Sequence, residues 1–204
     1  MIHKLQLEDF ELSYTIEGEG RDVLFLHGFP SNMYFWDNIK KELKDQLRVT
    51  VVEQRGYPLS SMNKFNVNDF NIENLSLDIE NLIKELNLNN NLIIVGHDWG
   101  SIVAWAIANR GNVVVKKLVL ICGGTEFPPS SVYENLVYEN GQHYITSFQN
   151  PEQANNLIAD NLDLFFRSAY RVTTKNEYKL LDLSLRKLFT THNEHSKIHN
   201  IDIN

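Results

Sequence analysis

One short turn-forming segment holds the residue best suited to attack a substrate. The stretch GHDWG at residues 96–100 places Asp98 between two glycines, directly after one apolar run and before another. Small residues on both sides allow a tight turn between a strand and a helix, and the helix N-terminus stabilises negative charge beside it. An ionised carboxylate needs no base to act as a nucleophile. The residues leave open a plain turn in which Asp98 only caps the helix.

A second turn, HGFP at residues 27–30, follows the first expected buried strand. The two turns together resemble those of α/β-hydrolases, in which the loop after that strand supplies one backbone N–H for an oxyanion. The residue after the nucleophile supplies the other. We therefore expect Phe29 and Trp99 to form an oxyanion hole through their backbone amides. The residues expected to support the motif structurally are His27, Gly28, Pro30, Gly96, His97 and Gly100.

The elements that must position these turns alternate along the chain up to residue 124. Loosely alternating residues predict an antiparallel pair of strands, and apolar runs predict four buried strands, while helical spacing predicts three helices. Strands alternating with helices indicate βαβ units, so the expected fold class is α/β, a mostly parallel sheet with helices on both faces. The predicted strands are 3–10 and 11–17, followed by the strands of the apolar runs 22–30, 48–56, 91–98 and 115–124, each with its closing turn residues. The predicted helices are 35–47, 72–86 and 101–109.

The pattern changes after Gly124, where the FPPSS segment leads into helix-like stretches only. We expect an α/β core at residues 1–124, a partial helical cap at 125–190 and a polar, disordered tail at 191–204. The tail contains His192, His195 and His199. The last two have a spacing that could bind a metal on a helix, but we favour a solvated tail and predict no metal or cofactor.

Composition excludes several functional classes. The net charge of −7 argues against a general nucleic-acid or anionic-membrane surface. No apolar run is long enough to span a membrane, and the N-terminus lacks a signal-peptide pattern. The only cysteine, Cys122, lies in an apolar run and is expected to be a buried strand residue. A single cysteine fits a cytoplasmic location.

At four separated points the chain resembles the epoxide hydrolase branch of the α/β-hydrolase fold. These points are HGFP with the following Trp36, EQRGYP at 53–58, GHDWG, and HYITSFQNP at 143–151. The resemblance implies that Asp98 attacks an epoxide and forms an alkyl-enzyme ester. It also implies that Tyr144, in the cap, protonates the opening oxygen, and that water activated by a histidine hydrolyses the ester to a diol. The implied partner is a small apolar substrate, an epoxide or an alkyl halide.

The chain departs from the family pattern at two places. Gln54 and Pro58 are unusual in the EQRGYP segment, and for Glu53 we favour a surface or loop role over one that orients the site. The family also carries its acid and histidine on strands after the cap, whereas no strand-like run follows residue 190. We therefore expect a truncated chain that lacks these two groups and the last strands. Its open sheet edge could support self-association.

Three alternatives remain. A haloalkane or haloacid dehalogenase would use the same aspartate, although Phe29 lacks the side-chain donor that helps one large dehalogenase group hold halide. A non-catalytic relic or binding scaffold would use the fold without the chemistry of Asp98. A complex in which a second chain supplies the missing strands, acid and histidine would restore turnover.

Overall fold

The computed structural model describes residues 1–8, 10–60, 66–88, 91–123, 148, 150–162 and 165–166. The chain divides into two compact units, residues 1–126 and 127–204. The strands of the first unit are β1 (His3–Gln6), β2 (Glu11–Glu17), β3 (Arg21–Leu26), β4 (Leu47–Glu53), β5 (Ile93–His97) and β6 (Lys117–Ile121). Its helices are η1 (Met33–Trp36), α1 (Asp37–Leu43), η2 (Pro58–Ser60), η3 (Val67–Phe70), α2 (Ile72–Glu85) and α3 (Trp99–Arg110).

The strands form one sheet in the order β1-β2-β4-β3-β5-β6. β1, β2 and β4 pair antiparallel, whereas β4, β3, β5 and β6 run parallel. Each parallel strand therefore ends at the same edge of the sheet, and the turns after β3 and β5 lie side by side. This arrangement confirms the predicted α/β fold and brings HGFP next to GHDWG.

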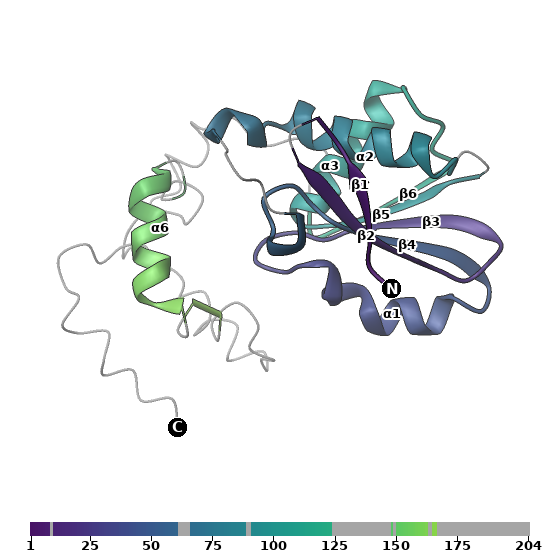
Figure 1. Ribbon diagram of the computed structural model, residues 1–204, viewed down its shortest axis with the longest axis horizontal. Coiled ribbons are helices and arrows are strands. Elements are labelled where there is room, and N and C mark those ends of the chain that lie inside the picture. The colour runs from purple at the N-terminus through teal and green to yellow at the C-terminus, as the bar shows by residue number, and fades with distance from the viewer. Residues whose placement is uncertain are drawn as a thin grey trace. The chain divides into compact units, whose positions relative to one another are not determined.

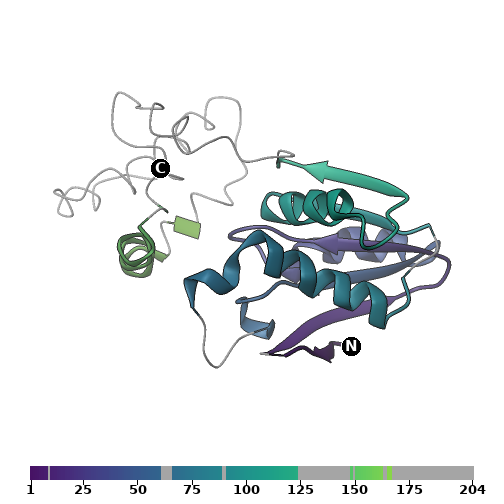
Figure 2. The same cartoon turned by 90° about the horizontal axis from the view of Figure 1, so that it is seen from above.

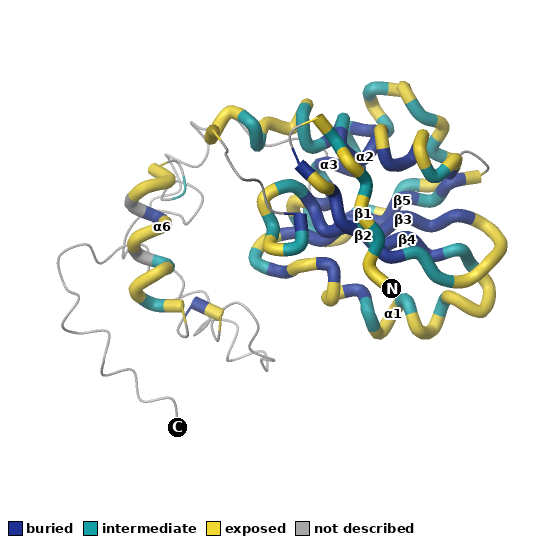
Figure 3. The backbone as a smooth tube through the Cα atoms, viewed as in Figure 1, coloured by how far each residue is buried: buried dark blue, intermediate teal, exposed yellow. Residues whose placement is uncertain are grey.

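Helices cover both faces of the sheet, α1 on one side and α2 and α3 on the other (Figures 1 and 2). Successive residues of β3 pack alternately on the two faces of the sheet. Leu24 packs in the cluster with α2 and α3, and Phe25 packs against Trp36 in the opposite cluster. The buried residues concentrate in the central strands (Figure 3). Burial on both faces explains why these strands read as continuous apolar runs.

The helix predicted over residues 35–47 begins differently from the expectation. It opens with the 3₁₀ turn η1, continues as α1 to Leu43, and Leu47 already belongs to β4. Two apolar residues of the predicted helix, Phe35 and Ile39, are exposed, while Trp36 is buried. A 3₁₀ turn has three residues per turn, so it rotates the following side chains away from the α-helical phase.

The prediction that Cys122 is a buried strand residue is wrong. Cys122 is exposed and has a φ of 55°, one residue beyond β6. Among the described strands, β6 pairs only with β5, and its residues Val119 and Ile121 are also exposed. The apolar run therefore marks a strand at the side of the described sheet, where only Leu118 and Leu120 pack on the core.

The described part of the second unit includes helix α6 (Pro151–Asp160), which falls inside a segment predicted to be helical. The other helical segments predicted after residue 124, and the tail, lie outside the described residues. The division into core, cap and tail therefore stays a prediction. None of the helices in the described ranges combines the length and the apolar character that a membrane span requires.

Candidate active site

The turn between β5 and α3 holds Asp98 in a strained backbone conformation. Its φ and ψ are 53° and −120°, a combination that residues with a side chain rarely adopt. The backbone N–H of Asp98 donates to the carbonyl of Ile121 at 2.9 Å, and the carbonyl of Asp98 accepts from Ser101 at 2.9 Å. Both neighbouring elements therefore hold this residue in place.

The glycines around Asp98 permit close backbone packing. A Cβ on Gly96 would stand 2.6 Å from the Cα of Ser101, and a Cβ on Gly100 would stand 2.6 Å from the carbonyl oxygen of His27. Gly123 is a position that sequence reasoning missed, where a Cβ would stand 2.7 Å from the carbonyl oxygen of Asp98. In the sequence, the double glycine after the apolar run of β6 is the feature that indicates this close packing.

The carboxylate of Asp98 meets the HGFP loop directly. The backbone N–H of Phe29 donates to Oδ1 of Asp98 at 2.8 Å, across 69 residues of sequence. Phe29 and Trp99, the first residue of α3, are 39% and 41% exposed as whole residues. One oxygen of an ionisable carboxylate therefore accepts the amide of one exposed aromatic residue, and a second exposed aromatic residue follows the carboxylate in the chain.

We expect Gly28→Ala to disrupt this contact. The new Cβ would stand 2.5 Å from Cβ of Asp98 and 2.6 Å from the carbonyl oxygen of His97, so the loop and the turn must separate. Crowding of this kind costs about 2 kcal/mol of unfolding free energy. Urea unfolding of the variant and of Gly111→Ala measures the cost. A Cβ at Gly111 meets nothing within 4 Å, so the loss in this control reports only the backbone strain at its φ of 69°. A Gly28→Ala loss no larger than that of Gly111→Ala would contradict the packing argument.

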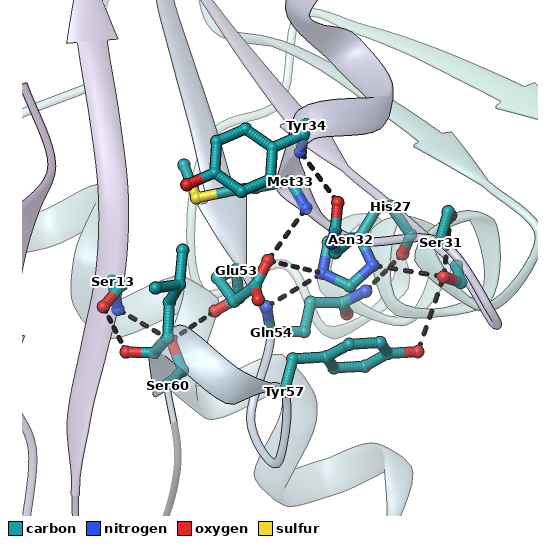
Figure 4. A network of polar contacts seen from close by, with 12 residues as sticks. Ser13, His27, Ser31, Asn32, Met33, Tyr34, Glu53, Gln54, Tyr57 and Ser60 are labelled. Carbon is teal, nitrogen blue, oxygen red and sulfur yellow. Dashed lines mark hydrogen bonds and ion pairs between the residues drawn. The ribbon is translucent and has the colours of Figure 1, made fainter.

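His27 is a buried, neutral part of the loop. Its Nε2 accepts the backbone N–H of Gln54 at 3.1 Å, so the ring proton is on Nδ1, which donates to the carbonyl oxygen of Gly28 at 3.1 Å (Figure 4). Burial lowers the pKa of His27 to about 4. The 3.8 Å approach of Nε2 to Glu53 is therefore not an ion pair near neutral pH.

The expected surface or loop role of Glu53 is wrong. Glu53 is 1% exposed and ends β4, and its Oε2 accepts the backbone N–H of Met33 at 2.8 Å. The next residue, Gln54, donates its side-chain amide to the carbonyl of His27. The end of β4 thus holds both ends of the segment from His27 to Met33. The sequence indicated only that Gln54 was unusual at its place in the EQRGYP segment.

His97 stands beside Asp98 and packs on an aromatic ring. Its imidazole stacks on Phe35 with ring centroids 4.7 Å apart, and its Nδ1 makes no hydrogen bond to any described residue. The fold thus brings Gly28 and Phe29 against Asp98, with Trp99 next in the chain and His27 bonded to the Gly28 carbonyl. Tyr144, and the tail residues His192, His195 and His199, lie outside the described residues.

Comparison with known proteins places this geometry in a family. The family model described as the alpha/beta hydrolase fold matches residues 23–196. The chain belongs to the α/β-hydrolase fold family. The described ranges contain no group of three or more His, Cys, Asp or Glu side chains that could hold a metal ion.

Two curated relatives and one solved structure show the resemblance in detail. "Epoxide hydrolase 1" of Caenorhabditis elegans is 36% identical over 117 residues, which cover 56% of this α/β-hydrolase and 28% of that protein. The "Cis-3-alkyl-4-alkyloxetan-2-one decarboxylase" of Shewanella oneidensis is 31% identical over 129 residues, covering 63% and 41% of the two chains. The crystal structure of an epoxide hydrolase from Vigna radiata is 27% identical, with a TM-score of 0.70, covering 83% and 54%.

These comparisons confirm the resemblance to epoxide hydrolases. The chain spans 28% and 41% of the length of the two curated relatives. The activity, the substrate and the partners of the whole protein are therefore matters of proposal.

Proposed function

We propose that this chain carries the nucleophile and the oxyanion hole of an epoxide hydrolase. Asp98 is the nucleophile, and the backbone amides of Phe29 and Trp99 are the oxyanion donors. The observation that carries the proposal is the 2.8 Å hydrogen bond from the Phe29 N–H to Oδ1 of Asp98. It differentiates the two carboxylate oxygens, because one is bound by the loop and the other is left for attack.

In the first step, Oδ2 of Asp98 attacks a carbon of the epoxide. A new C–O bond forms, the carbon–oxygen bond of the ring breaks with its electron pair going to oxygen, and that oxygen takes a proton. The product is an ester between Asp98 and the opened substrate. An ionised carboxylate performs this step without a general base.

In the second step, water attacks the carbonyl carbon of the ester. The carbonyl oxygen is Oδ1, so the negative charge of the tetrahedral intermediate develops on the atom that already accepts the Phe29 N–H. Donors placed before the reaction are the most effective stabilisers of such charge. Collapse of the intermediate releases the diol and restores the carboxylate. This step needs a general base, which we assign to none of the described residues.

Tyr144 is the proposed donor for the opening oxygen, on the strength of its place before the FQNP segment. We expect Tyr144→Phe to slow ester formation by about a hundredfold, because the alkoxide would leave without a positioned acid. The rate of mass increase under excess epoxide measures the effect. Tyr34→Phe, at an exposed tyrosine, is the matched control. Equal rates for Tyr144→Phe and the wild type would remove Tyr144 from the mechanism.

An apolar substrate suits the surroundings of Asp98. Phe29 binds the carboxylate through its backbone N–H and Trp99 follows Asp98 in the chain, and both aromatic residues keep about two fifths of their surface exposed. Aromatic surface beside a single charged group favours a small apolar molecule with one polar atom. An aryl epoxide fits this description.

The test of the proposal is intact mass spectrometry after incubation with styrene oxide, followed by peptide mapping. We expect a single adduct on Asp98, or styrene diol if the ester is hydrolysed. A folded chain that forms neither adduct nor diol would favour the non-catalytic scaffold instead.

A second candidate reaction rests on the relative from Shewanella oneidensis, whose name refers to oxetan-2-ones. An oxetan-2-one is, like an epoxide, a strained oxygen-containing ring that a carboxylate can open at carbon. Release of CO₂ from a dialkyl oxetan-2-one, with no diol from styrene oxide, would favour this reaction. Halide release from an alkyl halide under the same conditions would favour a dehalogenase.

A further inference from the structure

The peptide unit between Gly28 and Phe29 carries the proposed oxyanion donor on its nitrogen. The carbonyl of the same unit belongs to Gly28. In a trans peptide the C=O and the N–H point in opposite directions within one plane. The cis bond of this loop is the next one, Phe29–Pro30. Whatever holds the Gly28 carbonyl therefore sets the direction of the Phe29 N–H.

Three side chains converge on the carbonyl oxygen of Gly28. The hydroxyl of Ser31 donates at 2.8 Å, Nδ1 of His27 donates at 3.1 Å, and the hydroxyl of Tyr57 donates at 3.4 Å (Figure 4). Ser31 and His27 are 7% and 0% exposed, so water does not compete strongly for this oxygen. A carbonyl oxygen has two lone pairs, and three convergent donors are more than its ordinary complement.

The end of β4 sets the direction of the His27 ring. The backbone N–H of Gln54 occupies Nε2, which leaves Nδ1 as the donor toward Gly28. The side-chain amide of Gln54 also donates to the His27 carbonyl. Gln54, one of the two unusual residues of the EQRGYP segment, thus helps to hold the loop.

We propose that Ser31, with His27 and Tyr57, is a positioning residue that orients the Gly28–Phe29 peptide and so aims the Phe29 N–H at Asp98. This inference rests on the proposed function for its catalytic meaning, but not for its geometry. Donation to the Gly28 carbonyl also polarises the peptide and strengthens its N–H as a donor.

The Ser31 hydroxyl should affect the rates of ester formation and ester hydrolysis differently. The Phe29 N–H gains most from the charge on Oδ1 in the tetrahedral intermediate, and that charge is absent from the ester. Loss of the Ser31 hydroxyl should therefore slow hydrolysis of the ester by about tenfold and change its formation by less than about twofold.

The decisive experiment measures the chemical shifts of the Gly28–Phe29 peptide by NMR. Gly28–Phe29 is the only Gly-Phe pair in the sequence, so labelling glycine with ¹³C at the carbonyl and phenylalanine with ¹⁵N leaves one signal in an HNCO spectrum. Its ¹³C shift reports hydrogen bonds to the Gly28 carbonyl, and its ¹H shift reports the bond to Asp98. We expect Ser31→Ala to move both shifts upfield and Ser31→Thr to restore them.

Ser60→Ala is the matched control, because the buried Ser60 hydroxyl donates to a different carbonyl, that of Glu53, at 2.7 Å. It should leave both shifts in place. If Ser31→Ala does not fold, Tyr57→Phe tests the same carbonyl. A ¹³C shift that moves while the ¹H shift stays would overturn the proposal. If styrene oxide forms neither adduct nor diol, the proposed function fails, yet the spectrum still decides the positioning role.

Discussion

We expect Asp98→Asn to abolish ester formation while the chain stays folded. A neutral amide is not a useful nucleophile toward an epoxide, and loss of a nucleophile lowers the rate by on the order of 10⁴-fold or more. The replacement has nearly the same shape, and its side-chain oxygen can still accept the Phe29 N–H that now binds Oδ1. The loss therefore reports chemistry rather than a collapsed turn.

The measurement is the rate at which mass increases in excess styrene oxide, with the modified residue located by peptide mapping. Asp37→Asn is the matched control, because Asp37 is a partly buried aspartate at the start of α1 that pairs with Lys40 and lies outside the GHDWG and HGFP turns. It should be modified on Asp98 at the wild-type rate. An Asp98→Asn chain that still gains the adduct on another residue would show that the turn is not the reactive site.

The second large effect concerns stability at acid pH. In the unfolded chain His27 takes up a proton near its ordinary pKa of 6.5, whereas in the folded chain burial holds its pKa at about 4. Between these two values the unfolded state binds more protons, so stability falls as the pH falls. Protonation of His27 in the unfolded state alone lowers the free energy of unfolding by about 3 kcal/mol between about pH 7 and about pH 4.

The comparison of wild type with His27→Gln isolates this contribution. Urea unfolding at several pH values gives the free energy of unfolding for each chain. The variant is less stable at neutral pH, because it loses the bonds to Gln54 and Gly28, but its stability should depend less steeply on pH. His3→Gln, on the edge strand β1, controls for removing a histidine. Parallel curves for wild type and His27→Gln would contradict a depressed pKa.

Local patterns predicted the elements that carry the site. Apolar runs indicated β3 and β5, and the glycines of GHDWG indicated the turn that gives Asp98 its φ of 53°. A run of apolar residues and the steric limits of a turn depend on neighbours in the chain, so the sequence alone indicates them. The motif at residues 27–30 could also be placed after its strand for this reason.

Residues whose environment is set by distant segments could not be placed in this way. Glu53 was expected at the surface, yet it is buried because it faces the backbone of Met33. Cys122 was expected in the core, yet it is exposed just beyond a strand that has only one described neighbour. In both cases the residue type gave the usual preference, and the packing of other segments overruled it.

The sequence by itself determined the order of strands and helices along the chain, the strained turn at Asp98 and the resemblance to epoxide hydrolases, because each depends on short-range pattern. Only the tertiary structure decided how the Phe29 amide is aimed. That geometry joins residues from the ends of β3, β4 and β5, and links Phe29 to Asp98 and Gln54 to His27. Hydrogen bonds act over about 3 Å in space, whatever the separation along the chain, so only the parallel sheet that gathers those strand ends brings the partners together.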